Sequence, residues 1–220
     1  MSLELFCRKV GMTQIFSDSG ECIPVTVLEA GPNSIVQKKT EDKEGYAALQ
    51  MGYGERRPSR TPKPLAGHFQ KAGVAPKLAL RESRVTAEEA AAYEVGQEID
   101  TEIFSEGQRV DVIGHSKGRG TAGVVKRHNF KVKRRTHGTH EYFRHAGAIG
   151  AGAWPARVLK GMKMAGRLGN ARTTAVNQEI VRIDTERSLL FVRGAVPGHK
   201  NGIVRVRPSV KAPVGGGVPE

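Results

Sequence analysis

The chain lacks the residue patterns of secreted, membrane-spanning and zinc-binding proteins. Its two cysteines, Cys7 and Cys22, are too far apart for a Cys-x-x-Cys pair, so we expect reduced, partly buried thiols. No stretch approaches the roughly 18 apolar residues of a membrane span. The N-terminal residues include an early acid, Glu4, and no long apolar run, so we expect no signal peptide and an intracellular protein.

The sequence also lacks a recognisable catalytic constellation. Gly118-Arg119-Gly120 follows Lys117, but the G-x-x-x-x-G-K-[ST] spacing of a nucleotide-binding loop is missing. His137 and His140 are three residues apart, yet no nearby cysteine or pair of carboxylates completes a tetrahedral metal site. We therefore expect no enzyme activity, no cofactor and no bound metal.

Acidic residues are almost missing from one stretch, Gly114–Arg172, which we call the basic segment. It holds fourteen Lys and Arg residues and one acid, Glu141, so its net charge equals the +13 of the whole chain. Cations placed at phosphates release condensed counterions, and such a concentration of charge is therefore typical of polyanion binding, with nucleic acid as the first candidate. An anionic membrane is the weaker alternative, because the segment has no apolar face at helical spacing.

Large apolar residues are also scarce in the basic segment, whereas eleven of its residues are glycine. Such a composition cannot bury enough surface to fold alone, so a partner must order it. Glycines let backbones approach closely, which favours threading between RNA helices over resting on a flat duplex. A helix is expected at Thr121–Asn129, with Thr121 as its cap. Trp154 stands among Gly, Ala and Pro, which favours a contact with RNA at a tip over burial.

The remaining sequence predicts a mainly β fold with short helices. Short apolar-alternating runs such as Ile23, Val25 and Val27 lie between turn residues, which is typical of a barrel or sandwich. The capping pair Thr86 and Glu89 predicts the start of a helix. The expected domains are a β-barrel core at 1–113 and 173–211 with short helices near 64–72 and 87–93, a basic arm at 114–172, and a disordered tail at 212–220.

Several separate blocks of the chain resemble the bacterial large-subunit ribosomal protein L-three family, from about Lys9 to Lys211. The signature spacing of that family is matched by Phe104, Asp111, Gly114, Ser116, Gly118, Arg119, Gly120, Gly123 and Arg127. Similar blocks occur, in order, at Lys9–Phe16, Gly67–Phe69 with Lys71–Gly73, Lys163–Gly166 and Gly194–Gly198.

The resemblance implies a translation-protein-type β-barrel and a long basic arm that enters rRNA toward the peptidyl transferase centre. It further implies a structural constituent of the large ribosomal subunit that binds near the 3′ end of large-subunit rRNA, nucleates assembly and neighbours the L-fourteen and L-nineteen families. The expected location is the cytoplasmic ribosome. The implied rRNA-binding residues are Lys117, Arg119, Lys126, Arg127, Lys131, Lys133, Arg134, Arg135, His137, Arg144, His145, Arg157, Lys160, Lys163, Arg167 and Arg172.

The implied arm tip is where the chain departs from the family pattern. Family members commonly carry Gly-Gln-Asn-Gln before a proline, and here the residues are Gly150, Ala151, Gly152, Ala153, Trp154 and Pro155. Without a glutamine, the methylation that some relatives carry at this place cannot occur. His128 stands where the family often has tryptophan. A free architectural or regulatory DNA-binding protein is the alternative from another functional class.

Overall fold

The computed structural model describes residues 3–211, so the tail predicted at 212–220 lies outside the described residues. The chain divides into two compact units. The first unit runs up to His115 and resumes at Arg172, and the second unit is Ser116–Ala171. The prediction of a mainly β protein with short helices is confirmed. In the described part of the chain, no helix combines the length and the apolar character needed to cross a membrane.

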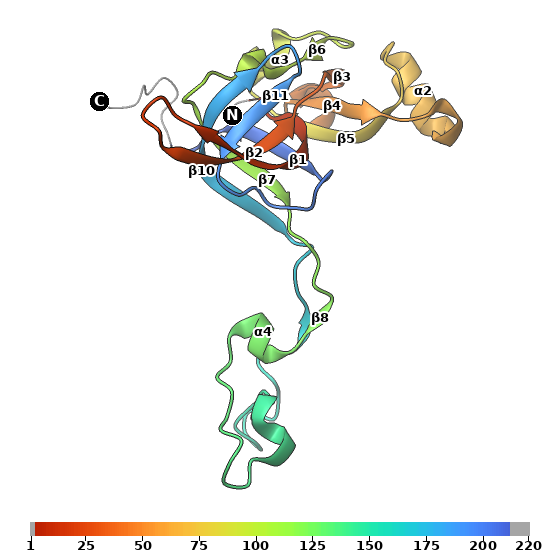
Figure 1. Cartoon of the computed structure of the whole chain (residues 1–220). Helices are drawn as coiled ribbons and strands as arrows, with labels where there is room; N and C mark the ends of the chain where they lie inside the picture. The colour runs from red at the N-terminus through yellow and green to blue at the C-terminus, as the bar shows by residue number, and fades with distance from the viewer. Residues whose placement is uncertain (1–2, 212–220) are drawn as a thin grey trace. The chain divides into compact units, whose positions relative to one another are not determined.

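Six antiparallel strands of the first unit close into a barrel in the order β1-β12-β7-β10-β11-β2 (Figure 1). Their bounds are β1 Leu5–Phe16, β2 Cys22–Glu29, β7 Arg109–His115, β10 Arg172–Asp184, β11 Leu189–Arg193 and β12 Ile203–Pro208. The first and last strands of residues 3–211 are neighbours, because Leu5 of β1 pairs with Val206 of β12. Gly114, His115 and Arg172, which the sequence prediction placed in the arm, belong to this ladder.

The barrel interior is filled by residues that alternate along the strands. Leu5 and Cys7 of β1 are fully buried, as are Val112 of β7 and Val206 of β12. Val206 pairs with both Leu5 and Val112, so these side chains point to one side of the sheet. Strand β1 continues through Gly11, because a register shift between Lys9 and Gly11 accommodates Val10 as the extra residue of a bulge.

The first unit also contains a separate four-stranded sheet, so the predicted barrel does not account for the whole core. Its order is β5-β4-β3-β6, with bounds β3 Asn33–Lys39, β4 Ala48–Glu55, β5 Lys77–Arg84 and β6 Glu98–Ile99. Strand β6 is short, because the chain turns into a 3-10 helix, η2, at Thr101–Ile103. Asp100 starts this turn by accepting a hydrogen bond from the N–H of Thr101.

Short helices connect the strands of this second sheet. They are α1 Glu41–Glu44, the 3-10 helix η1 Pro58–Arg60, α2 Lys63–Lys71 and α3 Ala87–Ala91. The predicted helices near 64–72 and 87–93 are therefore confirmed, and the second one ends two residues early. The capping box is present, with the Thr86 hydroxyl accepting from the N–H of Glu89 and the Glu89 carboxylate accepting from the N–H of Thr86.

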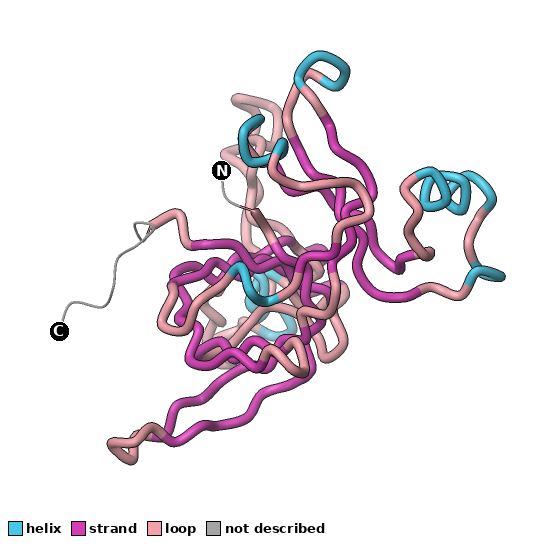
Figure 2. The backbone as a smooth tube through the Cα atoms, turned by 90° about the horizontal axis from the view of Figure 1, so that it is seen from above, coloured by secondary structure: helices cyan, strands magenta, loops and turns pink. Residues whose placement is uncertain are grey.

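The second unit has little regular structure. It contains β8 Thr121–Ala122, α4 Val124–His128, the 3-10 helix η3 His140–Arg144 and β9 Gly166–Arg167, and Figure 1 draws the backbone around β8 and α4 mostly as loop. Figure 2 shows that the helices of the chain (cyan) are short beside its strands (magenta). The expected cap at Thr121 is wrong. Thr121 is extended and pairs with Arg167 of β9, so the helix begins later, after Gly123 at the N-cap position.

Candidate nucleic-acid interface

The second unit starts and ends in a two-stranded stem held by backbone hydrogen bonds. The N–H of Ser116 donates to the carbonyl of Ala171 over 2.9 Å, and the N–H of Arg119 donates to that of Leu168 over 2.8 Å. The stem is close-packed at Gly169, whose φ is +76°, because a Cβ there would lie 2.1 Å from the carbonyl oxygen of Lys117. Glycine is required at this position for both reasons.

Beyond the stem, α4 is joined to the returning chain by two of its basic side chains. The Arg127 guanidinium donates to the carbonyl oxygen of Met164 over 2.7 Å, and the His128 ring lies 3.0 Å from the same oxygen. A Cβ on Gly166 would lie 2.7 Å from the Arg127 guanidinium. The glycine therefore makes room for the arginine, and Arg127 holds the two chain segments together.

The second unit has almost no hydrophobic core. Among its residues, only Ala122 and Val124 are buried. Eight of its large apolar side chains are exposed: Val132, Tyr142, Ile149, Trp154, Val158, Leu159, Met162 and Met164. This agrees with the expectation from composition that the segment cannot build a core of its own.

The cations of the second unit are uncompensated. Among residues 3–211, every ion pair present belongs to the first unit, where Arg8, Lys39, Arg109, Arg193, Arg205 and Arg207 face acids. The predicted contact residues of the second unit lie on the stem, on α4, in the irregular stretches and on β9, and all of their side chains except that of Arg127 are exposed. Arg172 is exposed on β10. A high density of positive charge is thus presented to solvent.

A few of these predicted residues are brought together by aromatic contacts. The guanidinium of Arg135 lies 4.7 Å from the ring centroid of Phe143, within the range of a cation–π interaction. The backbone N–H of Lys133 donates to the carbonyl of Phe143 over 3.0 Å. Tyr142 and His145 meet edge to face at 4.7 Å. In the part of the chain that the structure describes, Arg135 is the one cation of the second unit that lies over an aromatic ring.

The predicted tip residues are at the surface. Trp154 is 85% exposed, and Gly150 through Ala153 are also exposed. Trp154 is therefore not part of the barrel core, and a large indole ring is free to stack on a partner.

The paired histidines do not form a metal centre with their neighbours. Within residues 3–211, no group of three or more His, Cys, Asp or Glu side chains is placed to hold a metal ion. His137 and His140 adopt positive φ angles of 57° and 48°, which non-glycine residues rarely do. The two cysteines are free, but the expected partial burial is wrong for both, because Cys7 is fully buried and Cys22 is exposed.

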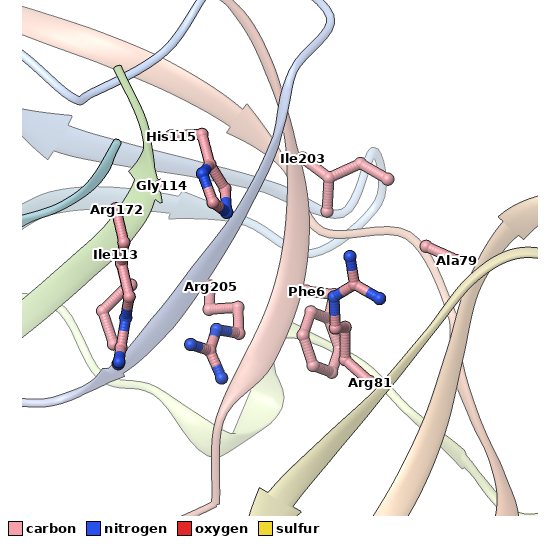
Figure 3. Close-up of a pocket in the computed structure, with 9 residues that line it drawn as sticks. All are labelled: Phe6, Ala79, Arg81, Ile113, Gly114, His115, Arg172, Ile203 and Arg205. Atoms are coloured by element: carbon pink, nitrogen blue, oxygen red, sulfur yellow. The ribbon is translucent and has the colours of Figure 1, made fainter. Parts of the chain in front are cut away.

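The first unit contains a pocket that was not anticipated from sequence. Phe6, Ala79, Arg81, Ile113, Gly114, His115, Arg172, Ile203 and Arg205 line a pocket of about 160 Å³ (Figure 3). The lining comes from five strands that are far apart in the sequence. No local motif reveals such a cluster, because strand pairing alone assembles it.

The comparisons with known proteins agree on one family. The family model described as "Ribosomal protein L3" matches residues 82–189. A protein of Thioalkalivibrio sulfidiphilus named large ribosomal subunit protein uL3 is 50% identical over 212 residues, which are 96% of this chain and 99% of the relative. Relatives of the same name from Methylobacillus flagellatus (52% identity; 96% and 99% of the two chains) and Kocuria rhizophila (49%; 94% of each) are equally similar. Identity at this level over nearly the full length of both chains shows that this chain belongs to the ribosomal protein L3 family.

Proposed function

We propose that this chain is a structural, non-catalytic constituent of the large ribosomal subunit, located in the cytoplasmic ribosome, and that its second unit binds large-subunit rRNA. The observation that carries the proposal is the uncompensated charge of Ser116–Ala171. Cations with no internal ion pair, on a segment with almost no core, are suited to phosphate contacts that also order the segment. The names of the relatives support the same assignment.

Three finer features belong to the proposal and follow from the family resemblance. The chain binds near the 3′ end of large-subunit rRNA and nucleates assembly. The basic segment extends through the rRNA toward the peptidyl transferase centre, with the exposed Trp154 near its end. The first unit adjoins ribosomal proteins of the L-fourteen and L-nineteen families.

The test compares two variants with equal loss of charge. The first carries glutamine in place of Lys131, Lys133, Arg134 and Arg135 in the second unit, and the control carries it in place of Lys43, Arg182, Arg187 and Lys200, all exposed in the first unit. Affinity for a folded fragment of large-subunit rRNA is measured against salt. For the unmodified chain, contacts by about half of the cations predict a slope of about −5 in log affinity against log salt, at about 0.7 to 0.9 per contact.

We expect the second-unit variant to flatten this slope by about 3 and the control to leave it unchanged. Equal slopes for the two variants would refute the assignment of the interface to the second unit. Duplex DNA of equal length serves as competitor. Preferential binding of DNA would instead identify a DNA-binding protein.

A further inference from the structure

The pocket of the first unit is built on the outer face of the barrel. Arg205 of β12 pairs with both Phe6 of β1 and Ile113 of β7, so these three side chains share one face of the sheet. The adjacent residues Leu5, Val112 and Val206 alternate to the interior. The face carrying Arg205 is therefore the outside of the barrel.

Two more basic residues extend the same face, and a third faces it from the other sheet. His115 lies two residues beyond Ile113 on β7 and pairs with Arg172 of β10. The side chains of His115 and Arg172 therefore lie on the same outer face of the barrel as that of Arg205. Ala79 and Arg81 come from β5, and they share a face because they are also two residues apart. Figure 3 shows these side chains around the pocket, with Ala79 and Arg81 on the same strand.

The lining combines an apolar floor with a cationic rim. Phe6 and Ile113 are almost fully buried, and Ile203 joins them in lining the pocket. The rim carries Arg81, His115, Arg172 and Arg205, and no acid lines the pocket. Only Arg205 has an ion-pair partner within residues 3–211, Glu4 at 3.0 Å. Arg81 donates only to the carbonyl of its neighbour Leu80, which leaves most of its guanidinium nitrogens available.

We propose that this pocket holds one nucleotide of the RNA backbone. The exposed Arg81 guanidinium holds the phosphate at the rim, and the ribose or base rests on Ile203 and Ala79, two apolar lining residues that are only half-buried. Arginine suits this role because its planar fork donates two parallel hydrogen bonds to a phosphate. The contact is additional to those of the second unit, and its RNA source rests on the proposed function.

Chain continuity favours RNA over an acidic protein as the occupant. His115 and Arg172, two of the lining residues, are covalently joined to Ser116 and Ala171, the ends of the second unit. RNA bound along the stem by Lys117 and Arg119 is thereby held at high effective concentration near the pocket.

The proposal is tested in the full chain with Arg81→Gln, which breaks no ion pair of the described residues. Arg187→Gln is the matched control, with the same loss of charge at an exposed turn outside the pocket. Ala79→Leu is a third variant that fills the pocket without changing charge.

In the assay, each variant and the unmodified chain are bound to large-subunit rRNA whose phosphates have been sparsely ethylated. The phosphates at which ethylation blocks binding are then mapped. Melting temperatures establish that all three variants fold.

We expect Arg81→Gln to weaken binding about tenfold, the effect of one lost charged hydrogen-bond pair, and to flatten the salt slope by about 0.7 to 0.9. Ethylation at one or two phosphates should no longer interfere with binding of this variant, while the phosphates contacted by the second unit stay sensitive. Ala79→Leu should lose sensitivity at the same phosphates.

Two other outcomes would contradict the reasoning, and they can be told apart. If the unmodified chain binds the rRNA but Arg81→Gln and Arg187→Gln have the same ethylation map, the pocket does not hold a nucleotide. A folded unmodified chain with no affinity for the rRNA would overturn the proposed function itself, and the pocket proposal with it.

Discussion

Replacement of Asp111 by alanine tests how the barrel holds the strand that returns from the second unit. Asp111 lies on β7 with a side chain that is 3% exposed. Its carboxylate accepts hydrogen bonds from the backbone N–H of Asn177 over 3.0 Å and of Val210 over 3.5 Å, and from the Arg207 guanidinium over 3.4 Å. One side chain thus ties β10, β12 and the segment after β12 to β7.

The Asn177 contact is the most important of the three. β10 changes register between Ala175 and Gln178, and Asn177 adopts a positive φ of 55°. The carboxylate receives the N–H that this irregularity turns away from the ladder. Its loss removes a hydrogen bond to a charged acceptor, about 1.5–3 kcal/mol, and leaves Arg207 with the more distant Glu4 at 3.9 Å. Because Arg207 is partly exposed, we add only about 1 kcal/mol for the ion pair, and expect a total of about 2–4 kcal/mol.

The loss is measured by denaturant and thermal unfolding of the purified chain. For a chain of this length, about 2–4 kcal/mol corresponds to a melting temperature about 4–16 °C lower. The control is Asp18→Ala, which removes the same charge from an exposed turn and should change stability by less than about 0.5 kcal/mol. If Asp111→Ala cost no more than the control, the carboxylate would not be anchoring β10.

The same carboxylate predicts a dependence on pH. Burial raises the pKa of Asp111, but hydrogen bonds from Asn177, Ser209 and Val210 and the charge of Arg207 outweigh it, so the pKa is lowered. A lowered folded pKa gives stability that is present above the unfolded value of about 3.9 and is lost as the pH falls through the folded value. The difference between the unmodified chain and Asp111→Ala should therefore be full at neutral pH and shrink below about pH 4.

Two further predictions concern local features. Gly169→Ala should open the stem of the second unit, because its Cβ would lie 2.1 Å from the Lys117 carbonyl oxygen at φ +76°. The left-handed backbone alone costs about 1–2 kcal/mol and the overlap adds to it, so amide exchange at Arg119 and Leu168 should be at least about 5- to 30-fold faster. Gly118→Ala, which meets only ordinary contacts, should leave this exchange unchanged. Thr86→Ala should destabilise the first unit by about 1 kcal/mol through loss of the α3 cap, and Thr86→Ser, which keeps the hydroxyl, should restore the melting temperature.

Features encoded within a few residues were predictable from sequence. The helix at Ala87–Ala91 is correct because the capping box of Thr86 and Glu89 is a local signal. The scarcity of a core in the second unit likewise follows from composition alone. The start of α4 was wrong for the opposite reason, since Thr121 is drawn into pairing with Arg167, which is distant in sequence.

Features created by strand pairing could not be predicted. Neither Arg81 nor Arg205 stands in a recognisable motif, and they line one pocket only because β5 and β12 meet there. The four-stranded sheet was missed similarly, because short alternating strands carry no information about which sheet they join. The placement of the exposed tip around Trp154 relative to rRNA stays a prediction.

The position of β12 has a consequence for synthesis of the chain. This strand lies between β1 and β7 in the barrel, although it is the last of the described strands to be made. The barrel therefore cannot close until Ile203–Pro208 has left the ribosome, whereas Ser116–Ala171 emerges earlier. During that interval a strongly cationic, coreless segment is exposed on an unfinished protein, and any nearby polyanion competes for it. Rapid capture by RNA would neutralise this segment and order it during that interval.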